Sequence, residues 1–289
     1  FKVDDLRKIS RTFLQPISNR LHSWQPALRH FPALLKKGLD QLGGVSVVPR
    51  LLLESSADDL DQSMKQSGID RAFVIAHPPF ASNEFVLEEA KHKPSFIPVV
   101  NISKAETKPG LKLKHYVKQG AKLLKIHAAA DGEGPKTPRY RTLLKVASEL
   151  GLPVILHTGE IENRLFYRDP KFGGAQLFQE WFGEFSDLTF VLAHMNFHDP
   201  RAALDLVEKY PNLLVDTSWQ PTEVIGEAVR RVGPERILFG TDWPLLGNNI
   251  EVGLQRIREA VHTSLITERD EQLILGENAL RLLGESPAK

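Results

Sequence analysis

The sequence contains no cysteine, and this absence removes several classes of site. A chain without thiols forms no disulfide framework and no thiolate zinc site, and it offers no cysteine nucleophile. No run of about 18 apolar residues occurs, which is the length that a transmembrane helix needs, and no signal peptide is recognisable. We therefore expect a cytoplasmic protein that does not enter a membrane.

An excess of either charge is also lacking. The 37 Lys and Arg residues nearly balance the 36 Asp and Glu residues, so the formal net charge is +1. Nucleic acids and anionic membranes attract clustered positive charge, and we expect neither as a partner. A hydrophobic content of 42% is typical of a globular protein with a large core.

Short apolar segments alternate with longer amphipathic ones along most of the chain. Predicted strands begin near residues 71, 96, 121, 152, 189, 213 and 237, at intervals of 24 to 37 residues. Predicted helices cover residues 55–68, 111–119, 138–151, 175–182, 200–210, 223–232, 250–262 and 268–283. Ser55 and Ser56 precede acidic residues by three positions and predict a capped helix start, and Gly68 predicts its end. This strict alternation predicts a parallel sheet covered by helices.

Seven such units are one short of the eight in a closed barrel. We predict a (β/α)8 TIM barrel whose first strand is Val45–Val48 or lies before Phe1. An open doubly wound sheet is the alternative, but the Asp131–Gly134 loop lacks the glycine spacing of a phosphate-binding turn. Residues 1–289 are expected to form a single domain, with an irregular segment over residues 1–53 packed on the barrel.

Three predicted strands end in a side chain that binds metal or transfers protons: His157, His194 and Asp242. Catalytic groups of a barrel lie at the carboxyl ends of its strands, so these three are expected to converge. Because side chains alternate along a strand, we expect His194 to share a face with Leu192, and Asp242 with Gly240. Imidazole and carboxylate groups suit zinc and similar divalent ions.

A second set of polar residues is expected around the same rim. Lys125 and His127 share one face of their strand; Lys125 either pairs with a substrate carboxylate or is satisfied by Asp216 or Asp242. Glu160 either contacts substrate or caps a loop. The candidate substrate-binding residues are Lys125, His127, Arg139, Glu160 and Trp243, and His77, Arg164 and His198 are weaker rim candidates.

Several motifs in order resemble those of the amidohydrolase-related family. The motifs are Gly120–His127 (GAKLLKIH), Leu152–Gly159 (LPVILHTG), Leu188–His194 (LTFVLAH), Pro211–Ser218 (PNLLVDTS), Arg236–Pro244 (RILFGTDWP) and Gly276–Leu283 (GENALRLL). The resemblance covers roughly residues 55–283. Members of this family are TIM-barrel, metal-dependent hydrolases, together with carboxy-lyases such as aminocarboxymuconate-semialdehyde decarboxylase.

The resemblance implies roles for three residues. His157 would ligate the metal after the fifth strand, His194 would ligate metal or activate water after the sixth, and Asp242 would bind metal and act as general base after the eighth. The first strand of the family ends in a His-x-His pair of metal ligands, and no such pair occurs in this sequence. Either the pair precedes Phe1, which we favour because the chain does not begin with Met, or the site is degenerate.

We therefore predict a metal-dependent hydrolase that cleaves a C–O or C–N bond of a small, carboxylated molecule through metal-activated water. The expected cofactor is a divalent metal, zinc by preference, and Asp242 and His194 are the expected catalytic residues. Non-oxidative decarboxylation on the same scaffold is the alternative, and a metal-free barrel with a binding or structural role is the second. A homo-oligomer is compatible with the apolar N-terminal segment.

Overall fold

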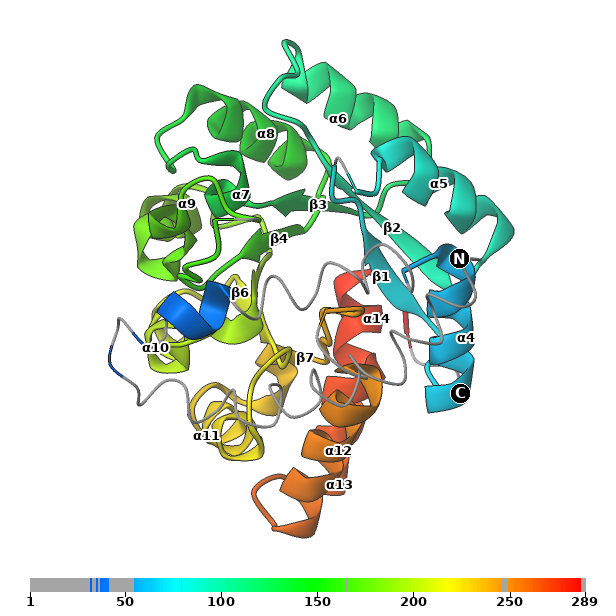
Figure 1. Ribbon diagram of the computed structural model, residues 1–289, viewed down its shortest axis with the longest axis vertical. Coiled ribbons are helices and arrows are strands. Elements are labelled where there is room, and N and C mark those ends of the chain that lie inside the picture. The colour runs from blue at the N-terminus through cyan, green and yellow to red at the C-terminus, as the bar shows by residue number, and fades with distance from the viewer. Residues whose placement is uncertain are drawn as a thin grey trace.

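The computed structural model describes residues 32, 35, 37–41, 55–78, 80–164, 166–245 and 249–286. Seven parallel strands form one sheet in sequence order. The strands are β1 (Ala72–Ile75), β2 (Phe96–Asn101), β3 (Leu123–Ile126), β4 (Val154–His157), β5 (Phe190–Ala193), β6 (Leu213–Asp216) and β7 (Ile237–Leu238). Every one of the seven predicted strands is present, and the sheet curls through an arc (Figure 1).

Helices follow the strands and cover the outer side of the arc (Figure 1). The α-helices are α4 (Ala57–Ser67), α5 (Asn83–His92), α6 (Pro109–Lys118), α7 (Ala128–Asp131), α8 (Pro138–Glu149), α9 (Gln179–Glu184), α10 (Pro200–Lys209), α11 (Thr222–Val232), α12 (Asn249–His262), α13 (Glu268–Gln272) and α14 (Asn278–Leu282). The 3-10 turns are η2 (Pro170–Gly173), η3 (Ala175–Phe178), η4 (His194–Asn196) and η5 (Pro234–Arg236). The predicted helix over 268–283 is interrupted by a π-helical turn, η6 (Leu273–Glu277).

Local signals in the sequence account for the helix ends. Ser56 and Asp59 form a reciprocal capping box at the start of α4, and Gly68 ends the helix in the left-handed conformation, with φ of 70°. Pro138 occupies the first turn of α8, where the missing N–H has no helical partner.

Two apolar layers lie on the two sides of the sheet, as side-chain alternation requires. The outer layer packs strand residues such as Leu124 and Ile126 against the helices. The inner layer is smaller, and its buried members are Ile97, Val99, Leu123, Ile155, Val191, Ala193 and Leu238. Lys125 continues the inner face of β3 beyond Leu123, so the predicted inward direction of this lysine is confirmed.

The strands β1 and β7 are the two edges of the described sheet. The seven described strands form a curled, incomplete barrel of the TIM type, which agrees with the predicted fold. The candidate first strand Val45–Val48 lies outside the described residues. The single-domain organisation over residues 1–289 remains a prediction.

A described piece of the N-terminal segment packs beside the barrel rim. Asp40 accepts hydrogen bonds from the backbone of Glu162 at 3.1 Å, and its backbone carbonyl accepts one from Asn163, also at 3.1 Å. His198 lies 3.4 Å from the other carboxylate oxygen of Asp40. These contacts join Asp40 to the segment that follows β4, and they place His198 at the rim.

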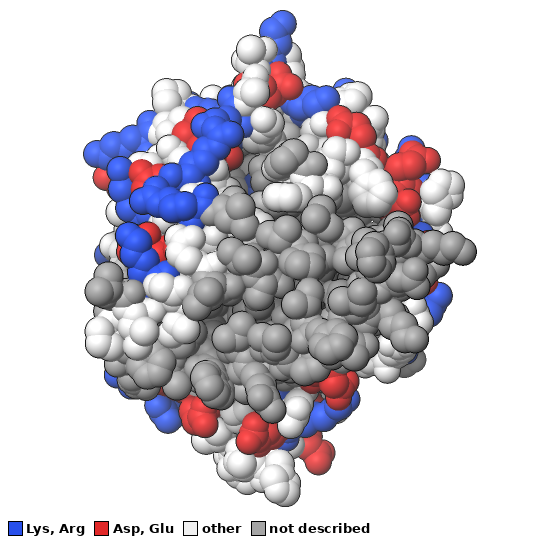
Figure 2. All heavy atoms as spheres, in the orientation of Figure 1, with Lys and Arg blue, Asp and Glu red and all other residues white. Residues whose placement is uncertain are grey.

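Among the described helices, none is long and apolar enough to cross a membrane. Lys, Arg, Asp and Glu side chains lie close to one another around the rim of the face in Figure 2.

Candidate functional site

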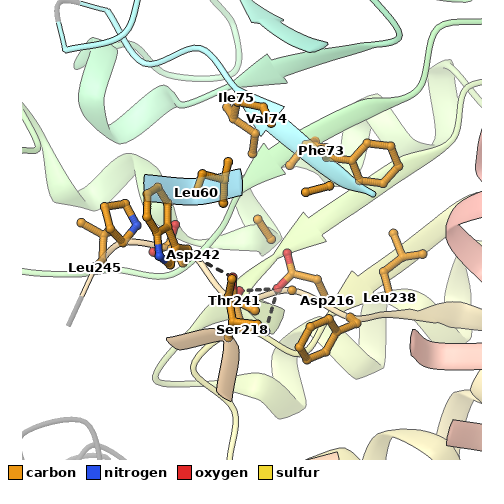
Figure 3. A pocket seen from close by; sticks show the side chains of 18 of the residues that line it. Leu60, Phe73, Val74, Ile75, Asp216, Ser218, Leu238, Thr241, Asp242 and Leu245 are labelled. Carbon is orange, nitrogen blue, oxygen red and sulfur yellow. Dashed lines mark hydrogen bonds between the residues drawn. The ribbon is translucent and has the colours of Figure 1, made fainter. Parts of the chain in front are cut away.

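A cavity of about 1800 Å³ runs along the inner face of the sheet and ends among polar side chains at the strand carboxyl ends. Its polar lining includes Lys125, His127, His157, His194, Asp216, Ser218 and Asp242. Apolar lining comes from both edge strands, and Figure 3 shows Phe73 of β1 and Leu238 of β7 bordering the space near Asp216. The convergence predicted from the strand ends is therefore present.

Four histidine rings form a chain across the mouth. The rings of His127 and His157 are stacked with centroids 3.7 Å apart and planes 13° apart. His194 meets His157 edge-on at 4.9 Å, and His77 lies 5.8 Å from His127. Burial lowers the pKa of His77, and lowers the pKa values of His127 and His157 strongly. These three rings are therefore neutral near pH 7, and each carries a nitrogen lone pair.

Lys125 is a buried amine at the centre of this polar end, with 6% of its surface exposed. Burial lowers its pKa to about 8, although the carboxylates of Asp242 and Asp216 act in the opposite direction. No described residue forms a hydrogen bond or an ion pair with it. Asp216 and Asp242 attract its charge without a direct ion pair, so both interpretations of Lys125 from the sequence stay predictions.

Asp242 reaches the cavity by a different route from the one expected. The pairing of β7 ends at Leu238, and the backbone N–H of Phe239 already donates to the carbonyl of Ile274, at 2.9 Å. The predicted strand over 237–242 is therefore too long. Asp242 has φ of 58°, and one of its carboxylate oxygens accepts a hydrogen bond from the indole Nε1 of Trp219 at 2.8 Å.

His194 also leaves its strand. Leu192 packs in the outer layer, whereas Val191 and Ala193 face inward, so the predicted pairing of His194 with Leu192 is wrong. The residues from His194 to Phe197 all have positive φ, from 39° to 63°, and this turn brings the imidazole back to the cavity. Such conformations cost energy for residues other than glycine and cluster at functional sites.

Two residues of β6 and its extension hold His194 in place. The Nδ1 atom of His194 lies 2.7 Å from Oγ of Ser218. Ser218 Oγ in turn donates a short hydrogen bond to Oδ1 of Asp216, which also accepts from the backbone N–H groups of Ser218 at 2.9 Å and His194 at 3.1 Å. Figure 3 shows Asp216 and Ser218 joined in this way.

The Asp216 carboxylate has room for these hydrogen bonds because residue 240 is a glycine. A Cβ atom at Gly240 would lie 2.8 Å from the carboxyl carbon of Asp216, which is closer than real contacts allow. Sequence reasoning considered Asp216 only as a partner for Lys125 and missed Ser218. The available signal was the alternation of Asp216 and Ser218 at the end of a predicted strand, which places both on the face that carries catalytic groups.

Two predicted substrate-binding residues lie outside the cavity lining. The guanidinium of Arg139 donates to the carbonyl of Ile102 at 2.7 Å, to Asp131 at 2.6 Å and to Glu133 at 2.9 Å. The guanidinium N–H groups are therefore used in hydrogen bonds within the protein. Glu160 is likewise not among the lining residues, and burial raises its pKa. Arg139 and Glu160 therefore lie outside the described cavity lining, whereas Trp243 lines the cavity.

Tyr167 is a lining residue that sequence reasoning missed. Its ring centroid lies 5.1 Å from that of His127 and 5.4 Å from that of His157. It belongs to the long segment between β4 and β5, where no periodic pattern identifies an inward-facing residue.

The side chains at the polar end of the cavity meet some of the requirements of a metal site, but not all of them. Nε2 of His157 is buried and has no hydrogen-bond partner, as expected of a nitrogen that serves as a metal ligand. Within the described ranges, however, no three His, Asp or Glu side chains come together as a metal-binding group. Catalytic zinc usually takes three protein ligands. The predicted set of His157, His194 and Asp242 is therefore not assembled by the described residues alone.

Comparisons with known proteins agree with this architecture. The sequence profile of the amidohydrolase family matches residues 51–284. No curated protein is similar enough to match the chain. Among solved structures, an uncharacterised TIM-barrel protein from Bordetella bronchiseptica is 21% identical, with a TM-score of 0.69 and with 93% of this chain and 90% of that chain covered.

Two decarboxylases are also similar in structure. The 2,6-dihydroxybenzoate decarboxylase from Rhizobium is 20% identical, with a TM-score of 0.65, 80% of this chain and 89% of that chain covered. The dihydroxybenzoic acid decarboxylase from Polaromonas, with bound manganese and the inhibitor 2-nitroresorcinol, is 19% identical, with a TM-score of 0.62 and coverages of 80% and 87%. At these identities the likeness shows the shared fold.

Proposed function

The chain belongs to the amidohydrolase family, and we propose that it hydrolyses a C–O or C–N bond in a small molecule that carries a carboxylate. Family membership identifies it as an enzyme of the hydrolase or carboxy-lyase type. The observation that carries the proposal is Lys125, a buried amine without a described partner at the polar end of a large cavity.

A buried ammonium is costly unless an anion joins it. With a pKa of about 8, Lys125 is mostly protonated at pH 7, so it presents a positive charge to the cavity. A substrate carboxylate supplies the missing counter-charge. His127 assists, because its Nδ1 accepts the backbone N–H of Ala130 at 3.2 Å, which leaves the proton of the neutral ring on Nε2 as a second donor.

Proton transfer is assigned to His194 and Asp242. His194 takes a proton from water at its Nε2, the water oxygen forms a bond to the substrate carbonyl carbon, and the C–O or C–N bond then breaks. The leaving alcohol or amine receives the proton from His194, and the other product is an acid. Asp242 stabilises the transient imidazolium through its negative charge, and Trp219 fixes the position of that carboxylate.

His157 is the proposed metal ligand. The unpartnered Nε2 of His157 is the described atom best suited to hold a divalent ion, with Asp242 as the proposed further ligand, which leaves Nε2 of His194 for the proton. When bound, such an ion polarises a carbonyl oxygen and lowers the pKa of water. The Polaromonas decarboxylase, which has bound manganese, supports a divalent metal without fixing its identity.

Decarboxylation is the second candidate, and one observation favours it. The inner apolar layer continues directly below Lys125 through Leu123 and Ile155, so a bound carboxylate leaves water almost completely. Loss of hydration destabilises a carboxylate relative to the CO2 that it releases. The similarity to two decarboxylases of known structure supports the same alternative.

A substrate panel tests the proposal. The panel pairs small carboxylated esters, amides and lactones with analogues whose carboxylate is replaced by a carboxamide, and both acid release and CO2 release are followed. We expect acid release from carboxylated members only, with kcat/KM reduced by at least about tenfold in Lys125→Met and less in Lys125→Arg. CO2 release without hydrolysis selects the second candidate. Equal turnover of acids and carboxamides refutes the role of Lys125.

A further inference from the structure

We propose that Ser218 and Asp216 are positioning residues that fix the proton of neutral His194 on Nδ1 and so leave the Nε2 lone pair available in the cavity. The importance of this tautomer for turnover rests on the proposed function, because His194 is there the group that accepts a proton. The hydrogen-bond arrangement itself stands independently of any substrate.

The direction of each hydrogen bond follows from Asp216, the acceptor at the end of the series His194–Ser218–Asp216. Oδ1 of Asp216 receives three donors: the hydroxyl of Ser218, the backbone N–H of Ser218 and the backbone N–H of His194. A backbone N–H only donates, so the two N–H groups directed at Oδ1 identify this oxygen as an acceptor. The hydroxyl proton of Ser218 is therefore committed to Asp216.

Ser218 Oγ must then act as an acceptor toward its other neighbour. The Nδ1 atom of His194 lies 2.7 Å from this oxygen, a normal length for a good hydrogen bond. Because the serine proton points to Asp216, the proton between these two atoms belongs to Nδ1. Neutral His194 then has its lone pair on Nε2, the atom that takes a proton or binds a metal.

The backbone around the pair restricts other orientations. Gln220 donates to the carbonyl of His194 at 2.7 Å, and the side chains of His194 and Ser218 are both buried. The N–H of His194 is tied to the same carboxylate oxygen as the serine hydroxyl. Rotation of the imidazole would leave the buried Oγ of Ser218 without its second partner, which is unfavourable for a buried polar atom.

His127, on the other side of His157, has the opposite arrangement. Its Nδ1 accepts the N–H of Ala130, so the proton of the neutral ring is on Nε2. The cavity is thus bordered by one histidine that donates from Nε2 and another that accepts at Nε2. A site that both binds an anion and removes a proton from water needs one of each kind.

Nitrogen-15 NMR of the full chain, labelled at histidine, tests the proposal. Two-bond proton–nitrogen correlations distinguish the two neutral tautomers, and spectra are recorded at alkaline pH, where free imidazole is neutral. A His194→Gln variant assigns the signals. We expect wild-type His194 to show its proton on Nδ1, Ser218→Thr to retain this pattern, and Ser218→Ala to shift His194 toward the Nε2–H form.

The outcomes separate this inference from the proposed function. A wild-type His194 with its proton on Nε2 overturns the inference, as does an unchanged tautomer in folded Ser218→Ala. If Ser218→Ala does not fold, the wild-type and Ser218→Thr spectra still decide. Once a substrate is known, we expect kcat in Ser218→Ala to fall by roughly 10–100-fold with little change in KM. A correct tautomer without any hydrolysis contradicts the proposed function and leaves the positioning role intact.

Discussion

Replacing the buried amine of Lys125 by an apolar side chain of similar length should stabilise the protein. Burial moves the pKa of Lys125 from its ordinary value of 10.5 to about 8. Each pKa unit corresponds to about 1.4 kcal/mol, so the folded protein disfavours the charged lysine by about 3 kcal/mol. Lys125→Met removes this penalty, and we expect its free energy of unfolding at pH 7 to exceed that of wild type by up to about 3 kcal/mol.

The pH dependence of stability provides an independent check on the direction of this effect. Between pH 8 and pH 10.5, Lys125 is neutral in the folded protein but protonated in the unfolded chain. The unfolded state then binds more protons, so the stability of wild type rises with pH across this window. We expect the advantage of Lys125→Met to be largest below pH 8 and to disappear near pH 10.5.

Denaturant unfolding at a series of pH values measures both quantities. The matched control is Lys145→Met on the exposed side of α8, which should change stability little and without a trend between pH 8 and pH 10.5. A variant Lys125→Met that is less stable than wild type at pH 7 refutes the reasoning. So does a stability difference that stays constant across the whole pH series.

Three further changes address the remaining parts of the site. Gly240→Ala places a Cβ atom 2.8 Å from the Asp216 carboxyl carbon, and we expect a loss of about 1–3 kcal/mol in unfolding free energy; wild-type stability would contradict the tight fit. Trp219→Phe removes the indole donor to Asp242 and should lower the free energy of unfolding by about 1.5–3 kcal/mol. Denaturant unfolding measures this loss, and Trp181→Phe, whose indole donates to a backbone carbonyl, is the control. Added zinc or manganese should raise the melting temperature of wild type but not of His157→Ala, and an equal rise in both rules out His157 as the ligand.

Regular strands are the part of the site that the sequence predicts well. Lys125 and His127 face the cavity because β3 keeps its alternation up to its end, with Leu123 in the inner layer and Leu124 and Ile126 in the outer one. Their direction therefore follows from a pattern of period two.

The positions of His194 and Asp242 were predicted, but the geometry that presents them was not. Both have positive φ, and neither is a glycine whose presence would signal such a conformation. The contacts of Ser218 and Asp216 with His194 join two different strands, so they depend on tertiary distance. Arg139 lies outside the lining, and its hydrogen bonds go to Asp131 and Glu133, which are close to it in the sequence.

The central claim is that the Lys125 amine binds an anion. Isothermal titration calorimetry of wild type and Lys125→Met with benzoate tests it. We predict binding to wild type at pH 7, weakening as the pH rises through 8 because the amine loses its proton, and no measurable binding to Lys125→Met. Benzoate binding of equal affinity in both proteins would contradict the claim.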